Sequence, residues 1–168
     1  GGQTIRQQSA FWTDKDTGLR CKVRPDLLCV DRGIMVDLKT TKSADARSFG
    51  WDCLKYGYDI QQAMYMDGYA QLKPKAYERF LFLAVEKTYP FCAAVYELDA
   101  EAVAAGYDLY REMLEAYKGF KAQDVWPGYP SGIQQLVLPK RYKGSDAAES
   151  SFASGAAEVV LEDGAAMF

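Results

Sequence analysis

Residues 24–41 read Arg-Pro-Asp-Leu-Leu-Cys-Val-Asp-Arg-Gly-Ile-Met-Val-Asp-Leu-Lys-Thr-Thr. Two apolar runs, at 27–30 and 34–36, lie on either side of the Asp-Arg-Gly sequence at 31–33. Short apolar runs separated by a turn that contains Asp and Gly are typical of a β-hairpin. We therefore predict two antiparallel strands here, with charged residues at their outer ends.

Three of those charged residues are predicted to share one face of the hairpin. Side chains along a strand alternate between its two faces, so Asp37 and Lys39 point the same way. If Asp31 pairs with Ile34 across the turn, Asp26 lies opposite Lys39 and diagonal to Asp37, within roughly 7–8 Å. A slip of one residue would put Asp26 on the other face, so this prediction depends on the turn.

Two neighbouring carboxylates and a lysine suit one kind of chemistry. The carboxylates repel each other unless a cation lies between them, and hard oxygen ligands favour Mg²⁺ or Mn²⁺. A lysine beside the ion can position a water molecule or stabilise charge that develops on a phosphate. The alternative is an ordinary hairpin with three solvated charges. Asp37 and Lys39 interrupt an apolar strand, where an unpaired charge is costly, and this favours the metal site.

The composition is that of one globular domain. The chain has 168 residues, of which 49% are hydrophobic, and it contains no histidine. Zinc sites of the usual kind and histidine-based catalytic triads are therefore excluded. The four cysteines show no C-x-x-C spacing, so we expect reduced thiols. The sequence has neither a membrane-spanning apolar run nor a signal-peptide pattern, and we expect a cytoplasmic protein with no membrane contact.

Charge is unevenly distributed along the chain. The net charge is −3, but residues 1–56 contain ten Lys and Arg against seven Asp and Glu, a balance of +3. A phosphate backbone responds to such local clusters more than to the total charge. Arg20, Lys22 and Arg24 alternate with apolar residues along a predicted strand. This basic stripe is either a solvated face of the sheet or a face that meets phosphates.

Strand and helix patterns alternate along the rest of the chain and predict an α/β (α+β) fold, with a mixed central sheet flanked by helices. Residues 79–86 and 91–98 are almost continuously apolar, which predicts central strands covered on both faces. Residues 1–142 form the predicted core, and residues 143–168 an acidic tail rich in small residues. The other predicted elements are strands near Phe11-Trp12 and at 19–26, a helix capped by Ser43 that ends at Leu54, helices at 58–72 and 99–120, and an extended piece at 133–138.

The order of short motifs resembles the PD-(D/E)xK nuclease superfamily. Arg24-Pro25-Asp26, then ten residues, then Asp37-Leu38-Lys39 resemble its core. Gln61 and Tyr65 match the Q-x-x-x-Y element of its exonuclease VIII-like and phage recombination exonuclease branch. The similarity covers about residues 9–142. Five motifs follow one another as in that branch: Phe11-Trp12-Thr13-Asp14, Thr17-Gly18-Leu19, Arg24-Pro25-Asp26, Asp37-Leu38-Lys39-Thr40-Thr41 and Tyr58-Asp59-Ile60-Gln61.

This resemblance implies a restriction-endonuclease-like fold and a Mg²⁺- or Mn²⁺-dependent exodeoxyribonuclease. Such enzymes degrade duplex DNA from its ends, 5′ to 3′, in recombination or repair, are encoded by bacteria or phages, and form closed homo-oligomeric rings. By the same resemblance, Asp26, Asp37 and the Leu38 carbonyl bind metal, Lys39 orients the attacking water, and Gln61 supports the site. The residues expected to contact DNA are Arg24, Thr40, Thr41, Lys42 and Tyr65.

Members of that branch carry further helices upstream of the first strand, with an acidic or histidine residue that completes the site. Here the ten residues before Phe11 contain neither an acid nor a histidine. We therefore expect either a truncated or divergent chain, or one whose upstream segments are missing. The alternative function is a non-catalytic DNA-binding or assembly subunit that keeps the nuclease fold. A site-specific endonuclease of the same superfamily is a third hypothesis.

The C-terminal segment, residues 144–168, contains five acids and no base and ends in Met167-Phe168. Such a segment suits a docking peptide, because the acids steer encounter with a basic surface and the two apolar side chains act as anchors. A single-strand annealing or single-strand-binding protein is the expected recipient. The alternatives are pairing of Val159-Val160-Leu161 with a sheet edge, and a solubilising tail without a partner.

Overall fold

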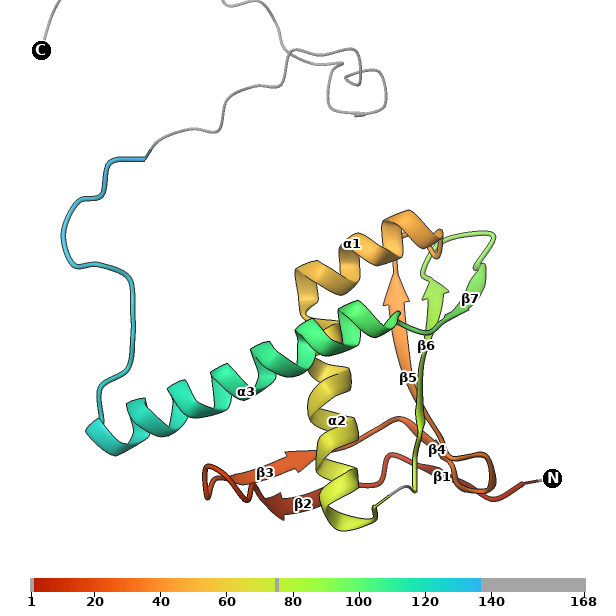
Figure 1. Ribbon diagram of the computed structural model, residues 1–168. Helices are drawn as coiled ribbons and strands as arrows, with labels where there is room; N and C mark the ends of the chain where they lie inside the picture. Colours follow the sequence, from red (N-terminus) through yellow and green to blue (C-terminus); the bar gives the residue numbers. More distant parts are fainter. Residues whose placement is uncertain (1, 75, 137–168) are drawn as a thin grey trace, which may run out of the picture. The chain divides into compact units, whose positions relative to one another are not determined.

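The hairpin of residues 24–41 lies in a five-stranded sheet with the strand order β1-β4-β5-β6-β7. The computed structural model describes residues 2–74 and 76–136 (Figure 1). Strands β4 (Leu27–Cys29) and β5 (Ile34–Thr41) are antiparallel, and β5 runs parallel to β6 (Arg79–Glu86). β1 (Thr4–Arg6) pairs with β4, and β7 (Ala93–Tyr96) pairs with β6, both antiparallel. The predicted mixed sheet is confirmed, whereas β1 was missed because its three residues lie in a polar segment.

Two helices connect the parallel strands β5 and β6, because a parallel pair needs a crossover. Helix α1 (Ala46–Tyr56) begins after Asp45, whose carboxylate accepts hydrogen bonds from the N–H groups of Arg47 and Ser48 at 3.0 and 3.2 Å. The predicted cap, Ser43, was therefore wrong by two residues. Gly57, with φ of 64°, ends α1 and starts α2 (Tyr58–Leu72). The residue ranges predicted for α2 and β6 are confirmed.

Helix α3 (Ala100–Gln123) crosses α2 (Figure 1). The Asp99 carboxylate caps it by accepting a hydrogen bond from the Ala102 N–H at 2.8 Å. The two helices approach so closely at Gly106 that a Cβ atom there would lie 2.6 Å from the backbone carbonyl of Asp59. Gly106 therefore fixes how near α3 lies to the first turn of α2.

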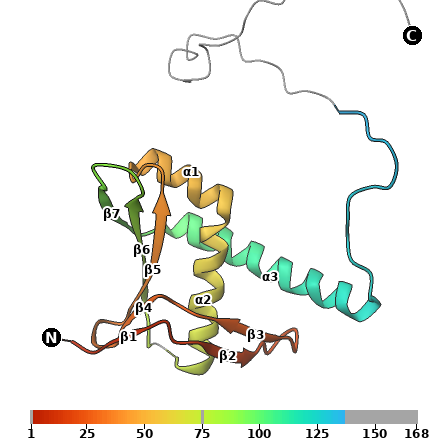
Figure 2. The same cartoon turned by 180° about the vertical axis from the view of Figure 1, so that it is seen from behind.

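A second, two-stranded sheet consists of β2 (Ala10–Thr13) and β3 (Arg20–Val23). Seen from behind, this hairpin crosses the C-terminal half of α2 (Figure 2). The buried ring of Trp12 fills the space over Gly68 of α2, where an added Cβ would lie 2.4 Å from the ring. The hairpin is thus packed on the helix by its inward face.

The hydrophobic core lies between the sheet and helices α1 and α2. The buried side chains of β5 and β6 on this face alternate along each strand, as the period of two requires. Phe49 of α1 stacks on Tyr96 of β7 at 5.1 Å between ring centroids and meets Phe82 of β6 edge-on at 6.3 Å. The largest buried side chains that the sheet contributes to this core are Leu28, Met35, Phe80 and Phe82.

The opposite face of the sheet is also apolar, but within the described residues no helix covers it. Leu38 is 50% exposed and Val95 is 60% exposed, while Val36, Leu81 and Leu83 are partly exposed. The prediction that residues 79–86 and 91–98 are covered on both faces is therefore wrong for the described structure. A long apolar run does not by itself reveal which neighbour covers each face.

The tyrosines of α3 do not all belong to the core. Tyr110 is buried, whereas Tyr107 and Tyr117 are exposed. Residues 125–136 contain no helix or strand, and the last two residues of the predicted extended piece at 133–138 lie outside the described residues. The first compact unit ends at Pro127. The predicted domain boundary after residue 142 and the predicted docking tail lie outside the described residues. No described helix is long and apolar enough to cross a membrane.

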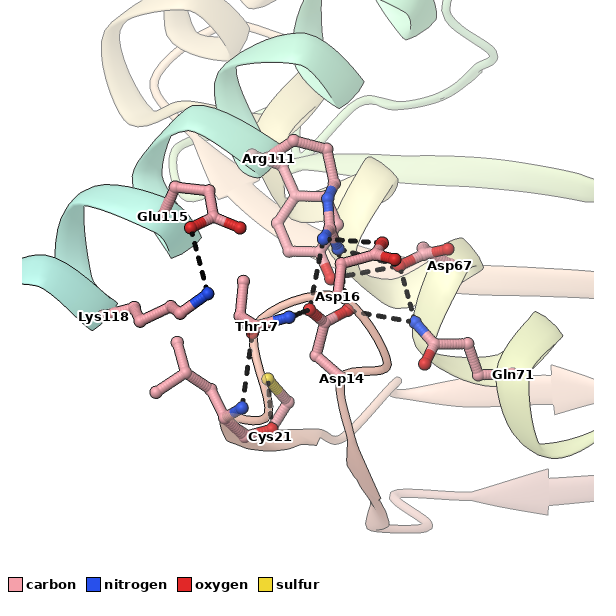
Figure 3. Close-up of polar contacts among 11 residues, drawn as sticks. Asp14, Asp16, Thr17, Cys21, Asp67, Gln71, Arg111, Glu115 and Lys118 are labelled. Atoms are coloured by element: carbon pink, nitrogen blue, oxygen red, sulfur yellow. Dashed lines mark hydrogen bonds and ion pairs between the residues drawn. The ribbon is translucent and has the colours of Figure 1, made fainter.

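A buried ion pair ties the turn of the β2–β3 hairpin to α3 (Figure 3). Asp14 is fully buried, and both of its carboxylate oxygens accept hydrogen bonds from Arg111, at 2.7 and 3.1 Å. The Thr17 hydroxyl and N–H donate to the same carboxylate at 2.7 and 2.9 Å. Arg111 also pairs with the more exposed Asp16 at 3.0 Å. The hydrogen bonds from Arg111, opposed by burial, hold the pKa of Asp14 well below its usual range.

We expect Gly106→Ala to destabilise the fold by about 1–3 kcal/mol, because its Cβ would overlap rigid backbone. Gly119 lies in the same helix with no atom within 4 Å of an added Cβ, so Gly119→Ala should stabilise by about 0.5–1 kcal/mol. Urea unfolding of both variants measures the difference. Equal effects would contradict the close approach of α3 to α2.

We expect Asp14→Asn to destabilise the protein at neutral pH by about 3 kcal/mol, since it breaks a buried charge pair. The folded state holds the pKa of Asp14 below the unfolded value of about 3.9, so this stability is present above that value and is lost as the pH falls below it. The variant should therefore lose less stability than the wild type between neutral pH and about pH 2. Thermal unfolding across this range measures both effects. Asp16→Asn, at the exposed partner of Arg111, should cost less than about 1 kcal/mol.

Candidate functional site

The register of β4 and β5 places Asp26 next to Asp37. Leu27 pairs with Val36, and the same register extended by one residue places Asp26 opposite Asp37. The predicted register, with Asp26 opposite Lys39, was wrong by two residues. The turn is a 3-10 helix over Val30–Arg32 closed by Gly33 in the left-handed conformation, and is therefore longer than predicted. A shift of two residues keeps every side chain on its face, so the predicted convergence of the three charged residues remains.

Asp26 is held by backbone groups on both sides. Its carboxylate accepts a hydrogen bond from the Leu38 N–H at 2.9 Å, just beyond the last paired residues of β4 and β5. Its backbone carbonyl accepts one from the Gln7 N–H at 3.0 Å, which continues the pairing of β1 with β4. The first carboxylate is thus fixed at the point where the two strands separate.

Asp37, Lys39 and Gln61 form a closed triangle between β5 and α2. Lys39 Nζ lies 2.6 Å from Asp37 Oδ2 and donates a hydrogen bond to Gln61 Oε1, also at 2.6 Å. Gln61 Nε2 donates to Asp37 Oδ1 at 3.0 Å. The amide of Gln61 is therefore oriented by a cation on one side and an anion on the other. The structure brings together the residues that the sequence predicted.

The Asp37 carboxylate lies in an environment that disfavours its charge. The residue is only 4% exposed. Burial raises its pKa, Lys39 and Gln61 oppose that rise, and the negative charge of Asp26 adds to it. Asp37 Oδ2 has no hydrogen bond of good geometry within the described residues, although Lys39 Nζ is close. A buried carboxylate oxygen that lacks a well-aligned donor, next to a second carboxylate, is a position where a cation would be stabilised.

The donor set at this position fits Mg²⁺ or Mn²⁺. Mg²⁺ is usually held by one or two carboxylates and keeps several water ligands, so Asp26 and Asp37 are sufficient. The backbone carbonyl of Leu38 is a candidate third oxygen ligand. Within the described residues no group of three or more His, Cys, Asp or Glu side chains is placed to hold a metal. A soft metal prefers sulfur or nitrogen ligands, which the oxygens of Asp26, Asp37 and Leu38 do not supply.

Tyr58 is part of the site although the sequence analysis did not assign it a role there. Lys39 Nζ lies 4.2 Å from the centroid of its ring, a distance at which the ring face attracts a cation. The ring in turn stacks on Phe82 at 5.8 Å. Tyr58 precedes Gln61 by three residues on α2, so the two share a helix face. The three-residue spacing between Tyr58 and Gln61 was the feature of the sequence that could have indicated a role for Tyr58 in the site.

The residues predicted to contact DNA divide into two groups. Arg24, Thr40 and Lys42 are exposed. Thr41 is buried, and its hydroxyl donates a hydrogen bond to Asp52 at 2.7 Å. The Tyr65 ring packs edge-on against Phe80 in the core. The Thr41 hydroxyl is thus engaged by Asp52 and the partly buried Tyr65 ring by Phe80, and the DNA-contact role of the five residues stays a prediction.

A family profile described as "PDDEXK-like domain of unknown function (DUF3799)" matches residues 4–137. This is more than half of the chain, and the protein therefore belongs to that family. Its predicted membership in the PD-(D/E)xK superfamily is confirmed. No curated protein matches the chain.

A crystal structure of a "putative exonuclease" from Eubacterium rectale has the same fold. The two chains are 20% identical, with a TM-score of 0.61, and the match covers 89% of this chain and 57% of the other. The chain thus spans little more than half the length of that protein. The restriction-endonuclease-like fold predicted from the sequence is confirmed.

We expect Mg²⁺ or Mn²⁺ to raise the melting temperature of the wild type, because a ligand that binds only the folded state stabilises it. Asp26→Asn and Asp37→Asn should each abolish that rise, since each removes a charge with little change in volume. Thermal unfolding with and without EDTA measures the effect. Asp108→Asn, at an exposed position of α3, should respond as the wild type does. A normal response in Asp37→Asn would contradict the metal assignment.

Proposed function

We propose that this protein is a Mg²⁺- or Mn²⁺-dependent exodeoxyribonuclease. It hydrolyses phosphodiester bonds from the ends of duplex DNA, 5′ to 3′, in recombination or repair. The single observation that carries this proposal is the pair Asp37 and Lys39 on β5, bridged by Gln61, with the Asp26 carboxylate bound to the N–H of Leu38 between them. The family match supports the same class of chemistry.

The ion would supply a water of lowered pKa and a Lewis acid for a phosphate oxygen. Side chains of the protein provide the binding of the ion, its orientation and a positive charge. Asp26 and Asp37 would hold the ion, and Gln61 fixes the orientation of Asp37. Lys39 provides a positive charge where negative charge develops on the phosphate, and it orients the attacking water. Its contacts with Gln61 Oε1 and the Tyr58 ring keep the ammonium group in the site when a cation neutralises Asp37.

The restriction to DNA ends and the polarity are supported by the resemblance of the ordered motifs to recombination exonucleases. That resemblance also supports a closed homo-oligomeric ring, in which threading of the duplex retains the enzyme on its substrate. It further supports a bacterial or phage origin and a cytoplasmic location. A single-strand annealing protein is the proposed partner, because resection exposes the strand that such a protein binds.

We expect the wild type to degrade linear duplex DNA in Mg²⁺, to spare closed circles and to be inactive in EDTA. Lys39→Ala should lower kcat by about 10²–10³-fold, since its charge acts mainly in the transition state. DNA binding with Ca²⁺ in place of Mg²⁺ should change little in this variant. Lys118→Ala, at an exposed lysine of α3, is the matched control.

Three outcomes of this experiment separate the alternatives. Cleavage of closed circles would indicate an endonuclease. DNA binding without cleavage would indicate a non-catalytic subunit that keeps the fold. Equal losses of binding and turnover in Lys39→Ala would make the lysine a phosphate clamp and not a catalytic group. Duplexes labelled at one 5′ or 3′ end report the polarity.

A further inference from the structure

We propose that the outward face of the β2–β3 hairpin binds single-stranded DNA next to the cleavage site. The inference rests on the proposed function for the identity of the substrate. It adds a site for the unpaired strand, separate from the carboxylates that hold the metal. The contacts across the hairpin, the exposure of one aromatic ring and the rigid attachment of the hairpin carry the argument.

The pairing of β2 with β3 sorts the hairpin residues onto two faces. Ala10, Trp12, Cys21 and Val23 are buried against the helix layer. On the outward face, Phe11 pairs with Lys22 and Thr13 pairs with Arg20 across the strands. The alternation continues one residue past β3, so exposed Arg24 follows Lys22 on the same side. This fully described face holds three cations and an aromatic ring, and no acid.

Phe11 is placed like a binding residue and not like a core residue. It is 61% exposed although it lies in the centre of a strand. Lys22 Nζ lies 5.3 Å from the centroid of its ring. The two strands also line an open hollow, to which Phe11, Thr13, Arg20 and Lys22 contribute. An exposed ring with a cation over one face, in such a hollow, places an apolar surface within a positive field.

That combination matches the chemistry of an unpaired nucleic-acid strand. Bases stack on exposed aromatic rings, and cations follow the phosphate backbone beside them. Successive outward residues of a strand are about 6.6 Å apart, so Arg20, Lys22 and Arg24 form a regular row of charge. Inside a duplex both faces of a paired base are covered by its neighbours and only the terminal pair has a free face, so an unpaired strand offers the Phe11 ring many more bases. The structure therefore favours the strand that resection leaves unpaired.

The hairpin is also near the site and rigidly held. Arg24 lies two residues before Asp26, so their Cα atoms are at most about 7 Å apart. Trp12 anchors the inward face over Gly68 of α2. The Asp14–Arg111 ion pair fixes the turn, as Figure 3 shows. A preorganised surface loses less conformational entropy when it binds a flexible strand.

The test measures binding of fluorescein-labelled oligothymidylate and of blunt duplex to the full chain in Ca²⁺, by fluorescence anisotropy. We expect Phe11→Leu to weaken oligothymidylate binding roughly 5- to 150-fold and duplex binding much less. Phe11→Trp should retain or increase the affinity for oligothymidylate. Replacing Arg20, Lys22 and Arg24 together by Gln should reduce the slope of log affinity against log salt by about 2, at about 0.7 for each phosphate contact. Arg32→Gln, at an exposed arginine of the β4–β5 turn, is the control.

The outcomes separate this inference from the proposed function. If Phe11→Leu binds oligothymidylate as the wild type does, or if the wild type does not bind it, the inference is overturned, even when Mg²⁺-dependent cleavage of duplex ends is intact. If these variants lose oligothymidylate binding but the wild type cleaves no DNA, the inference stands and the nuclease proposal fails. Preference for an acidic peptide over oligothymidylate would also overturn it. Unchanged melting temperatures are expected, because the side chains are exposed, and they exclude misfolding as the cause.

Discussion

The site depends on a single constraint, which is that Asp37 carries its carboxylate into the interior of a sheet. Burial of an ionised carboxylate is costly unless charges and donors compensate for it. Here Lys39 from the same strand and Gln61 from α2 provide the compensation. β5 can hold such a group in place, because it is paired with β6 along its whole length and with β4 up to Val36, the residue before Asp37. Helix α2, packed on this strand, supplies the Gln61 amide that contacts both charges.

Helix α2 transmits the geometry of the scaffold to the site. Its first turn carries Tyr58 and Gln61, which contact Lys39. At the same turn α3 approaches the backbone of α2 closely, at Gly106, and the other end of the helix supports the hairpin through Gly68. A change in either glycine contact would therefore shift the helix that orients Lys39. Gly68 and Gly106 therefore influence the geometry of the site, although neither has a polar side chain.

Much of this fold and site was predictable because the deciding signals are local. The alternation of Asp37 and Lys39 and the helical spacing that begins at Tyr58 depend on short stretches of sequence. The register of β4 with β5 was not predictable, since a 3-10 turn and a two-residue turn suit the same Asp-Arg-Gly sequence. Contacts between distant residues left no local signal either. Asp14 and Arg111 are 97 positions apart, and nothing in either neighbourhood indicates the other.

The protein contains two buried aspartates whose opposite environments distinguish a structural carboxylate from a functional one. Asp14 is surrounded by donors from Arg111 and Thr17, and its pKa is held low. Such a group is fully satisfied within the described structure and has no need of a ligand. For Asp37, burial and the neighbouring charge of Asp26 raise the pKa against the opposing contributions of Lys39 and Gln61. A cation placed between Asp26 and Asp37 would meet two carboxylates, whereas a cation at Asp14 would have to displace an arginine that binds both carboxylate oxygens. The same residue type at nearly the same burial therefore holds the fold together in one place, and in the other it is the residue that we propose as a metal ligand.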